Sequence, residues 1–136
     1  MNITETTWTG AWEFDAKAHG FTFHLDGQES TDVERTGPGP KIILLNALSA
    51  CSGIDVVATL KKMRVDIRSL NIKATGSLSD EHPKVYTMIH LIFEAGIDAA
   101  DEDKLVRAIA LSLSTYCGVA GMLDKTATIT SEVVVV

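Results

Sequence analysis

Two cysteines are the side chains in this sequence best suited to chemistry. Cys51 lies in the stretch LLNALSACSGIDVVATL, residues 44–60, which is almost entirely apolar or small. Cys117 lies much later, in the stretch LSTYCGVAGML. A thiolate is a nucleophile, and a second thiol can condense with an oxidised one, so such a pair suits redox chemistry.

The plainer alternative is that each cysteine is a small buried residue without chemistry, because free cysteine is among the most buried residue types. The distance between the two cysteines in the sequence excludes a Cys-x-x-Cys motif, and no Cys or His cluster has zinc-site spacing. We therefore expect no metal and no bound cofactor.

Asp55 follows Cys51 by four residues, which places both side chains on one face of an unbroken helix. It is a candidate general base for the thiol or a group that binds a polar ligand. An ionised carboxylate at this place also disfavours the thiolate. The alternative is an acid satisfied by hydrogen bonds to a neighbouring helix or a lysine, as buried acids normally are.

Composition narrows the class of protein. The 136 residues include 12 basic and 18 acidic side chains, a formal charge of −6, and 46% are hydrophobic. Nucleic-acid binding usually needs a basic surface, and anionic lipid repels an acidic one, so we expect neither nucleic-acid nor membrane partners. The beginning of the sequence lacks a signal-peptide pattern, so we expect one cytoplasmic domain with reduced thiols.

The N-terminal part is predicted to be β-structure. Residues 3–14 and 21–25 are rich in aromatic and β-branched residues, with a turn predicted between them at DAKAHG, residues 15–20. The two tryptophans are expected in a core, with a ligand pocket as the alternative. Residues 28–40 are polar and end in Gly-Pro-Gly-Pro, which predicts a loop.

Pro40 is suited to open a helix, and the apolar pattern continues on nearly all faces to Met63. This pattern favours a buried core helix over a membrane span. Gly53 is either a break in the helix or a point of close packing. Cys51 lies roughly 15 Å from the start of such a helix, beyond the reach of its dipole.

The C-terminal part alternates between strand and helix patterns. Residues 65–97 contain two strand patterns around the turn SDEHPK, the first beginning at Val65, which predicts a β-hairpin. A helix is predicted next, with Asp98 or Asp101 as its N-cap, and its apolar face continues to Tyr116.

Strands and helices thus occur in blocks, which predicts an α+β fold with helices packed on a mostly antiparallel sheet. The predicted segments of the single domain are a β-meander and loop (1–36), a central helix (37–64), a β-hairpin (65–97), a second helical region (98–125) and a final strand (126–136).

The two cysteine settings resemble the OsmC/Ohr family of bacterial osmotically induced and organic hydroperoxide resistance proteins. The resemblance rests on LLNALSACSGIDVV, with Pro40 eleven residues before Cys51, and on ALSLSTYCGVAGML. KVYTMIHLIFEAG and DKLVRAIALSLSTYC support it, and it runs from about Gly37 to Val136. It implies an intertwined homodimer whose two long central helices are wrapped by sheets, with both active sites at the interface.

The resemblance also implies roles for the thiols. Cys51 would attack a hydroperoxide and become a sulfenic acid, and Cys117 would condense with it to a disulfide that an external dithiol reductant opens. An apolar pocket around Cys51 would favour organic hydroperoxides over hydrogen peroxide.

In the family peroxidases an arginine in the N-terminal turn stabilises the thiolate, and a glutamate after the helix-opening proline holds that arginine. Here the corresponding turn, FDAKAHG, offers Lys17, the residue after Pro40 is Lys41, and the nearest arginine is Arg35. The chain is most similar to the divergent OsmC-like redox proteins. Tyr116 is a candidate to cover the thiol pocket or to pack in the core.

Three functions follow as hypotheses. The first is a thiol-dependent enzyme of oxidative-stress defence that reduces organic hydroperoxides. The second is a non-enzymatic dimer that binds an apolar small molecule at its interface. The third is a redox sensor whose disulfide alters partner binding, which requires that the two sulfur atoms can bridge.

Overall fold

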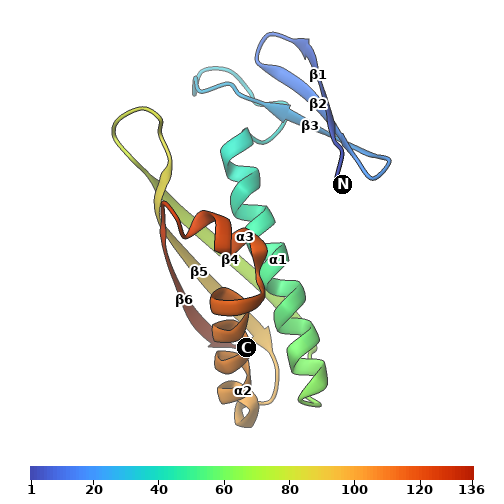
Figure 1. Ribbon diagram of the computed structural model, residues 1–136, viewed down its shortest axis with the longest axis vertical. Helices are drawn as coiled ribbons and strands as arrows, with labels where there is room; N and C mark the ends of the chain where they lie inside the picture. Colours follow the sequence, from blue (N-terminus) through green and yellow to red (C-terminus); the bar gives the residue numbers. More distant parts are fainter. The chain divides into compact units, whose positions relative to one another are not determined.

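The computed structural model describes residues 1–136, and the chain forms two compact units, residues 1–44 and 45–136. Each unit has its own three-stranded sheet, with the strand orders β1-β2-β3 and β4-β5-β6 (Figure 1). Helices accompany the second sheet, so the predicted α+β class is confirmed.

The first unit is an antiparallel meander of β1 (Glu5–Gly10), β2 (Glu13–Ala18) and β3 (Phe21–Asp26). The turn predicted at residues 15–20 is wrong in its first part, because Asp15, Ala16 and Lys17 pair with both neighbouring strands and Ala18 pairs with β3.

The turns of this meander are shorter than the sequence suggested. Ala11 and His19 adopt φ values of 45° and 52°, in the left-handed region that reverses a chain tightly. Neither residue is a usual choice for that conformation, so the sequence signal for these turns is weak.

The loop after β3 is fastened to the end of that strand. The buried carboxylate of Asp26 accepts hydrogen bonds from the backbone N–H groups of Gln28 (2.9 Å) and Thr36 (3.0 Å). These bonds, the one from Thr36 first, hold the pKa of Asp26 below its usual range. Arg35 donates from Nη1 to the Asp26 carbonyl oxygen at 2.7 Å. The loop therefore has a defined conformation.

The aromatic side chains of the meander are exposed in the single chain. Trp8 and Trp12 are 64% and 65% exposed, so the expectation that they lie in a core is wrong for this chain alone. They line, with Phe14, an open apolar depression of about 560 Å³. This arrangement corresponds to the pocket alternative, although nothing in the structure occupies it.

Helix α1 runs from Pro40 to Lys62 without a break, and it begins where the sequence predicts. Gly53 is a close-packing point, because a Cβ atom added there would lie 2.9 Å from Cδ1 of Ile72. A side chain at this position would therefore require the end of the Ile72 side chain to move.

The second sheet is formed by β4 (Ser69–Leu78), β5 (Tyr86–Gly96) and β6 (Thr128–Val135). β5 pairs antiparallel with β4 and parallel with β6, so this sheet is mixed, whereas both pairings of the first sheet are antiparallel. The prediction that β4 begins at Val65 is wrong. Arg64 has φ 59°, and the N–H of Val65 still donates to Leu60, so the chain turns before the strand starts.

Helices cover one face of this sheet, as Figure 1 shows. The buried side chains of β5 alternate with more exposed ones, which is the pattern of a sheet with one covered face. The connection from β5 to β6 contains a 3₁₀ turn (Ala99–Asp101), α2 (Glu102–Leu111) and α3 (Gly118–Leu123). Asp98 caps this connection by accepting from the N–H of Ala100, as one of the two predicted caps.

Replacing Gly76 by alanine is expected to destabilise the second unit. The new Cβ atom would lie 2.6 Å from the ring of Tyr86, which is buried, so G76A should lower the free energy of unfolding by about 1–3 kcal/mol. Urea unfolding measures this change. The control is G121A in α3, where no atom lies within 4 Å and alanine favours the helix by about 1 kcal/mol. Equal stability of G76A and wild type would contradict the packing described.

Candidate redox site

The fold brings the two cysteines together from separate elements. Cys51 lies on α1, half-buried and packed against the hydrophobic core, whereas Cys117 belongs to that core and is 4% exposed. Both are free thiols, and the Cys51 thiol lies near enough to raise the pKa of Cys117. A disulfide cycle needs two neighbouring thiols of this kind.

A π-helical turn, Ser112–Tyr116, sets the position of Cys117. The sequence predicts a regular helix up to Tyr116, but α2 ends at Leu111 and the next turn is wider. The N–H of Cys117 donates to the carbonyl of Ser112 at 2.8 Å, five residues back. Insertion of such a turn rotates every later residue away from the helical position, and π turns occur often at functional sites.

Cys117 then leaves the helical conformation, with φ −73° and ψ 105°, and caps α3. Its sulfur accepts a hydrogen bond from the N–H of Ala120 at 3.3 Å. Burial raises the pKa of the Cys117 thiol to about 11, and the hydrogen bond with Cys51 acts in the same direction. At neutral pH this thiol is therefore protonated.

Asp55 takes part in a polar contact between α1 and the π turn. The hydroxyl of Ser112 donates to Oδ2 of Asp55 at 2.9 Å and lies 3.1 Å from Oγ of Ser52. Ser112 and Ser52 are 1% and 0% exposed. Because the single Ser112 proton goes to the carboxylate, Ser52 can donate its own proton to Ser112. The carboxylate thus has a hydrogen-bond partner on the helical segment that leads to Cys117.

Three of the candidate supporting residues lie in the first unit, and one lies beside Cys117. Lys17 is an exposed residue of β2, Arg35 is held by the Asp26 carbonyl, and Lys41 lies in the first turn of α1. Tyr116 ends the π turn and is 63% exposed, so it does not pack in the core. Within the second unit, the structure brings together Cys51, Cys117 and Asp55.

Sequence reasoning missed Ser112 and Ser52 as parts of the site. Two features of the sequence could have indicated them. Ser112 lies on an otherwise apolar helical face, and Ser52 directly follows Cys51. A serine on an apolar face needs a hydrogen-bond partner once it is buried. The identity of that partner depended on the π turn, for which the sequence has no clear marker.

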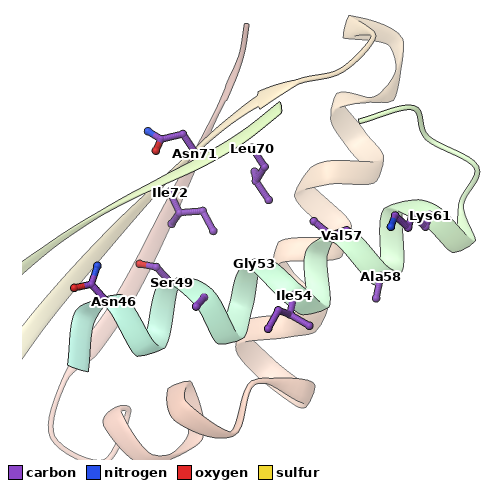
Figure 2. Close-up of a pocket in the computed structure, with 11 residues that line it drawn as sticks. Asn46, Ser49, Gly53, Ile54, Val57, Ala58, Lys61, Leu70, Asn71 and Ile72 are labelled. Atoms are coloured by element: carbon purple, nitrogen blue, oxygen red, sulfur yellow. The ribbon is translucent and has the colours of Figure 1, made fainter. Parts of the chain in front are cut away.

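An open apolar groove runs between α1 and β4. Its volume is about 820 Å³, and Figure 2 shows Leu70 and Ile72 of β4 pointing towards α1. Ile54 points from α1 away from the strand and is 70% exposed. Cys51 does not line this groove. The prediction of a helix buried on nearly all faces is therefore wrong for the single chain.

By length and composition alone, α1 is apolar enough to cross a membrane, although the core helix of a soluble protein meets the same criterion. Two of its residues, Leu48 and Val56, are fully buried against the second unit's own core, and Asp55 is bonded to Ser112. These contacts are those of a core helix, with an additional apolar face left open.

The fold and the paired thiols agree with a family-wide comparison. The model of the OsmC-like protein family matches residues 27–132, which is most of the chain. The chain therefore belongs to the OsmC/Ohr family, and the family predicted from the sequence is confirmed.

Individual relatives cover nearly the whole chain. Protein YhfA of Escherichia coli (strain K12) is 37% identical over 120 residues, which are 88% of this chain and 86% of that protein. The structure of an OsmC-like protein from Mycoplasma pneumoniae matches with TM-score 0.86 and 20% identity, over 100% of this chain and 97% of that one. The organic hydroperoxide resistance protein OhrB of Bacillus subtilis matches with TM-score 0.73 and 13% identity, over 98% and 97%. The two structures show that this chain has the fold of those proteins.

The raised pKa of Cys117 predicts slow alkylation. In a C51S variant, iodoacetamide should modify native Cys117 far more slowly at pH 8 than the same residue in urea, as measured by mass spectrometry. The pKa of Cys117 is higher in the native state than in the unfolded state, so the native thiol is still protonated at pH values where the unfolded thiol is not. The free energy of unfolding should therefore fall as pH rises from about 9 to about 11. A C117S variant, which reports Cys51 alone, serves as the comparison. Equal modification of Cys117 in native and unfolded protein would contradict its burial.

Proposed function

We propose that this protein reduces organic hydroperoxides by a disulfide cycle between Cys51 and Cys117. The observation that carries the proposal is the proximity of the two thiols, one on α1 and one at the end of the π turn. Membership of the OsmC/Ohr family supports it, because some structural neighbours are described as organic hydroperoxide resistance proteins.

The cycle has three balanced steps. The thiolate of Cys51 attacks the terminal oxygen of the hydroperoxide, the O–O bond breaks, and a sulfenic acid and an alkoxide form. The alkoxide takes up from solvent the proton that the Cys51 thiol released on ionising, which gives the alcohol. The thiol of Cys117 then attacks the sulfenic sulfur, and its proton leaves with the hydroxyl group as water. An external dithiol finally reduces the disulfide and is itself oxidised. No bound cofactor takes part.

The surroundings of the thiols fit this division of roles. Cys51 is half-buried, so an incoming hydroperoxide can approach it, whereas Cys117 is buried and protonated at neutral pH. The neighbours of both are apolar core residues, which favours an alkyl hydroperoxide over hydrogen peroxide. Resolution by Cys117 also protects the sulfenic acid from further oxidation.

We also propose that two copies of the chain associate through the groove between α1 and β4. The groove is lined mostly by apolar side chains and includes the exposed Ile54, and an open apolar surface of this kind marks an interaction site. A second α1 helix, with its stripe of Ser49, Ala50 and Gly53, matches the groove in apolar character and allows close approach. Such a dimer would work in the cytoplasm, where thiols are kept reduced.

The activity predicts a specific pattern in cysteine variants. Wild type should consume cumene hydroperoxide with a dithiol reductant, C51S should fall to background, and C117S should stop after one turnover with Cys51 as sulfenic or sulfinic acid. Ferrous oxidation–xylenol orange measures the peroxide, and mass spectrometry identifies the oxidised cysteine. Equal turnover by wild type and C51S would exclude the proposed cycle.

The dimer predicts a change of mass in a groove variant. I54E places a charge in the proposed interface, so it should shift wild-type dimers to monomers in analytical ultracentrifugation. V106E replaces another exposed aliphatic residue, on α2, and is the matched control. A monomeric wild type, or a small molecule retained in the groove by native mass spectrometry, would contradict occupation by a second copy.

A further inference from the structure

We infer that Ser112 is a positioning residue, which fixes the distance between the two thiols by binding α1 with its side chain and Cys117 with its backbone. The inference rests on the proposed disulfide cycle and names a residue that controls its second step. The side chain of Ser112 bonds to α1 close to Cys51, and its backbone carbonyl bonds to the N–H of Cys117.

The side-chain bond joins Ser112 to α1. Its hydroxyl donates to Asp55 at 2.9 Å and lies 3.1 Å from Ser52. Ser52 directly follows Cys51 in α1, and Asp55 lies one helical turn after Cys51. All the hydrogen bonds involved are largely shielded from water, since Ser52 and Ser112 are buried. A hydrogen bond to a carboxylate in such a place is among the stronger ones in proteins.

The backbone bonds join Ser112 to the segment with the second thiol. Its N–H ends α2 by donating to Ala108 and Ile109, and its carbonyl accepts the N–H of Cys117 at 2.8 Å. The π turn therefore starts at the residue that is fixed to α1, and it ends at Cys117. A shift of Ser112 along α1 would move Cys117 by a similar amount.

Disulfide formation tolerates little movement. The Cα atoms of a bridged pair are usually about 4.4–6.8 Å apart, so a displacement of about 1 Å can remove the pair from bonding geometry. Formation of the sulfenic acid on Cys51 does not depend on this distance. Loss of the Ser112 hydroxyl should therefore weaken disulfide formation and leave the attack on peroxide largely intact.

The test measures the redox equilibrium of the thiol pair against dithiothreitol. In that exchange the protein dithiol and oxidised dithiothreitol give the protein disulfide and reduced dithiothreitol. S112A should reduce the equilibrium constant for the protein disulfide about tenfold, because the two thiols are no longer held at bonding distance, which is a rise in potential of about 30 mV. No peroxide is involved, so the result is independent of peroxidase activity.

The matched control is S114A, in the same π turn. The hydroxyl of Ser114 is exposed and bonds to Ala110 of its own helical segment at 2.7 Å, so its loss should leave the equilibrium constant unchanged. S112T and S112V have the same shape and differ only in the hydroxyl, and S112T should hold the pair together better than S112V. This second pair remains informative if S112A folds poorly.

Stopped-flow measurement of the two oxidation steps separates the inference from the proposed function. With cumene hydroperoxide, S112A should form the Cys51 sulfenic acid at the wild-type rate and convert it to disulfide about tenfold more slowly. No sulfenic acid in wild type would overturn the proposed function alone. Equal equilibrium constants in wild type, S112A and S114A would overturn the role of Ser112.

Discussion

The hydrogen bond from the Ser112 hydroxyl to the Asp55 carboxylate is the contact on which the site depends. It connects α1, the central helix of the second unit, to the only wide turn in the connection from β5 to β6. A partly buried carboxylate loses hydration when the helices pack, and the serine hydroxyl replaces part of it. Asp55, a carboxylate that is unexpected near the thiol of Cys51, thus has a hydrogen-bond partner in Ser112, which lies on a different helical segment.

The two thiols are placed in different environments by this arrangement. Cys117 lies in the core, where desolvation keeps it protonated, and Cys51 lies at the edge of that core. The arginine and glutamate of the family peroxidases have no counterpart among Cys51, Asp55 and Ser112. Activation of Cys51 is accordingly the step in which this member of the family would differ most from those enzymes.

The sequence predicted the elements whose signals are local. Pro40 marks the start of α1, and the alternation of apolar residues marks β5, because both patterns act through neighbouring residues. The turn at Ala11 was missed, since alanine is not typical of a left-handed conformation, whereas the turn at His19 lies within the predicted segment DAKAHG. The π turn was missed for a different reason. It is fixed by the contact of Ser112 with Asp55, which are far apart in the sequence.

The exposure of apolar residues was also not predictable from pattern alone. A helix that is apolar all round is expected inside a protein, but the pattern does not say whether one chain supplies all the surroundings. Here Leu48 faces the core of its own unit and Ile54 faces the solvent. The two cysteines, by contrast, were recognised from their sequence settings, and the fold does bring them together.

The parallel pairing of β5 with β6 has a consequence for the order in which the molecule forms. Residues in this pairing, such as Met88 and Thr128, are separated by the whole connection that contains Cys117. Contacts between segments so distant in sequence require the closure of a long loop, and they slow folding. Cys51 and Cys117 are also far apart in the sequence, so bringing them together likewise requires the closure of a long loop. A chain in which this strand pairing has not yet formed carries two unpaired, accessible thiols that are open to oxidation by other routes.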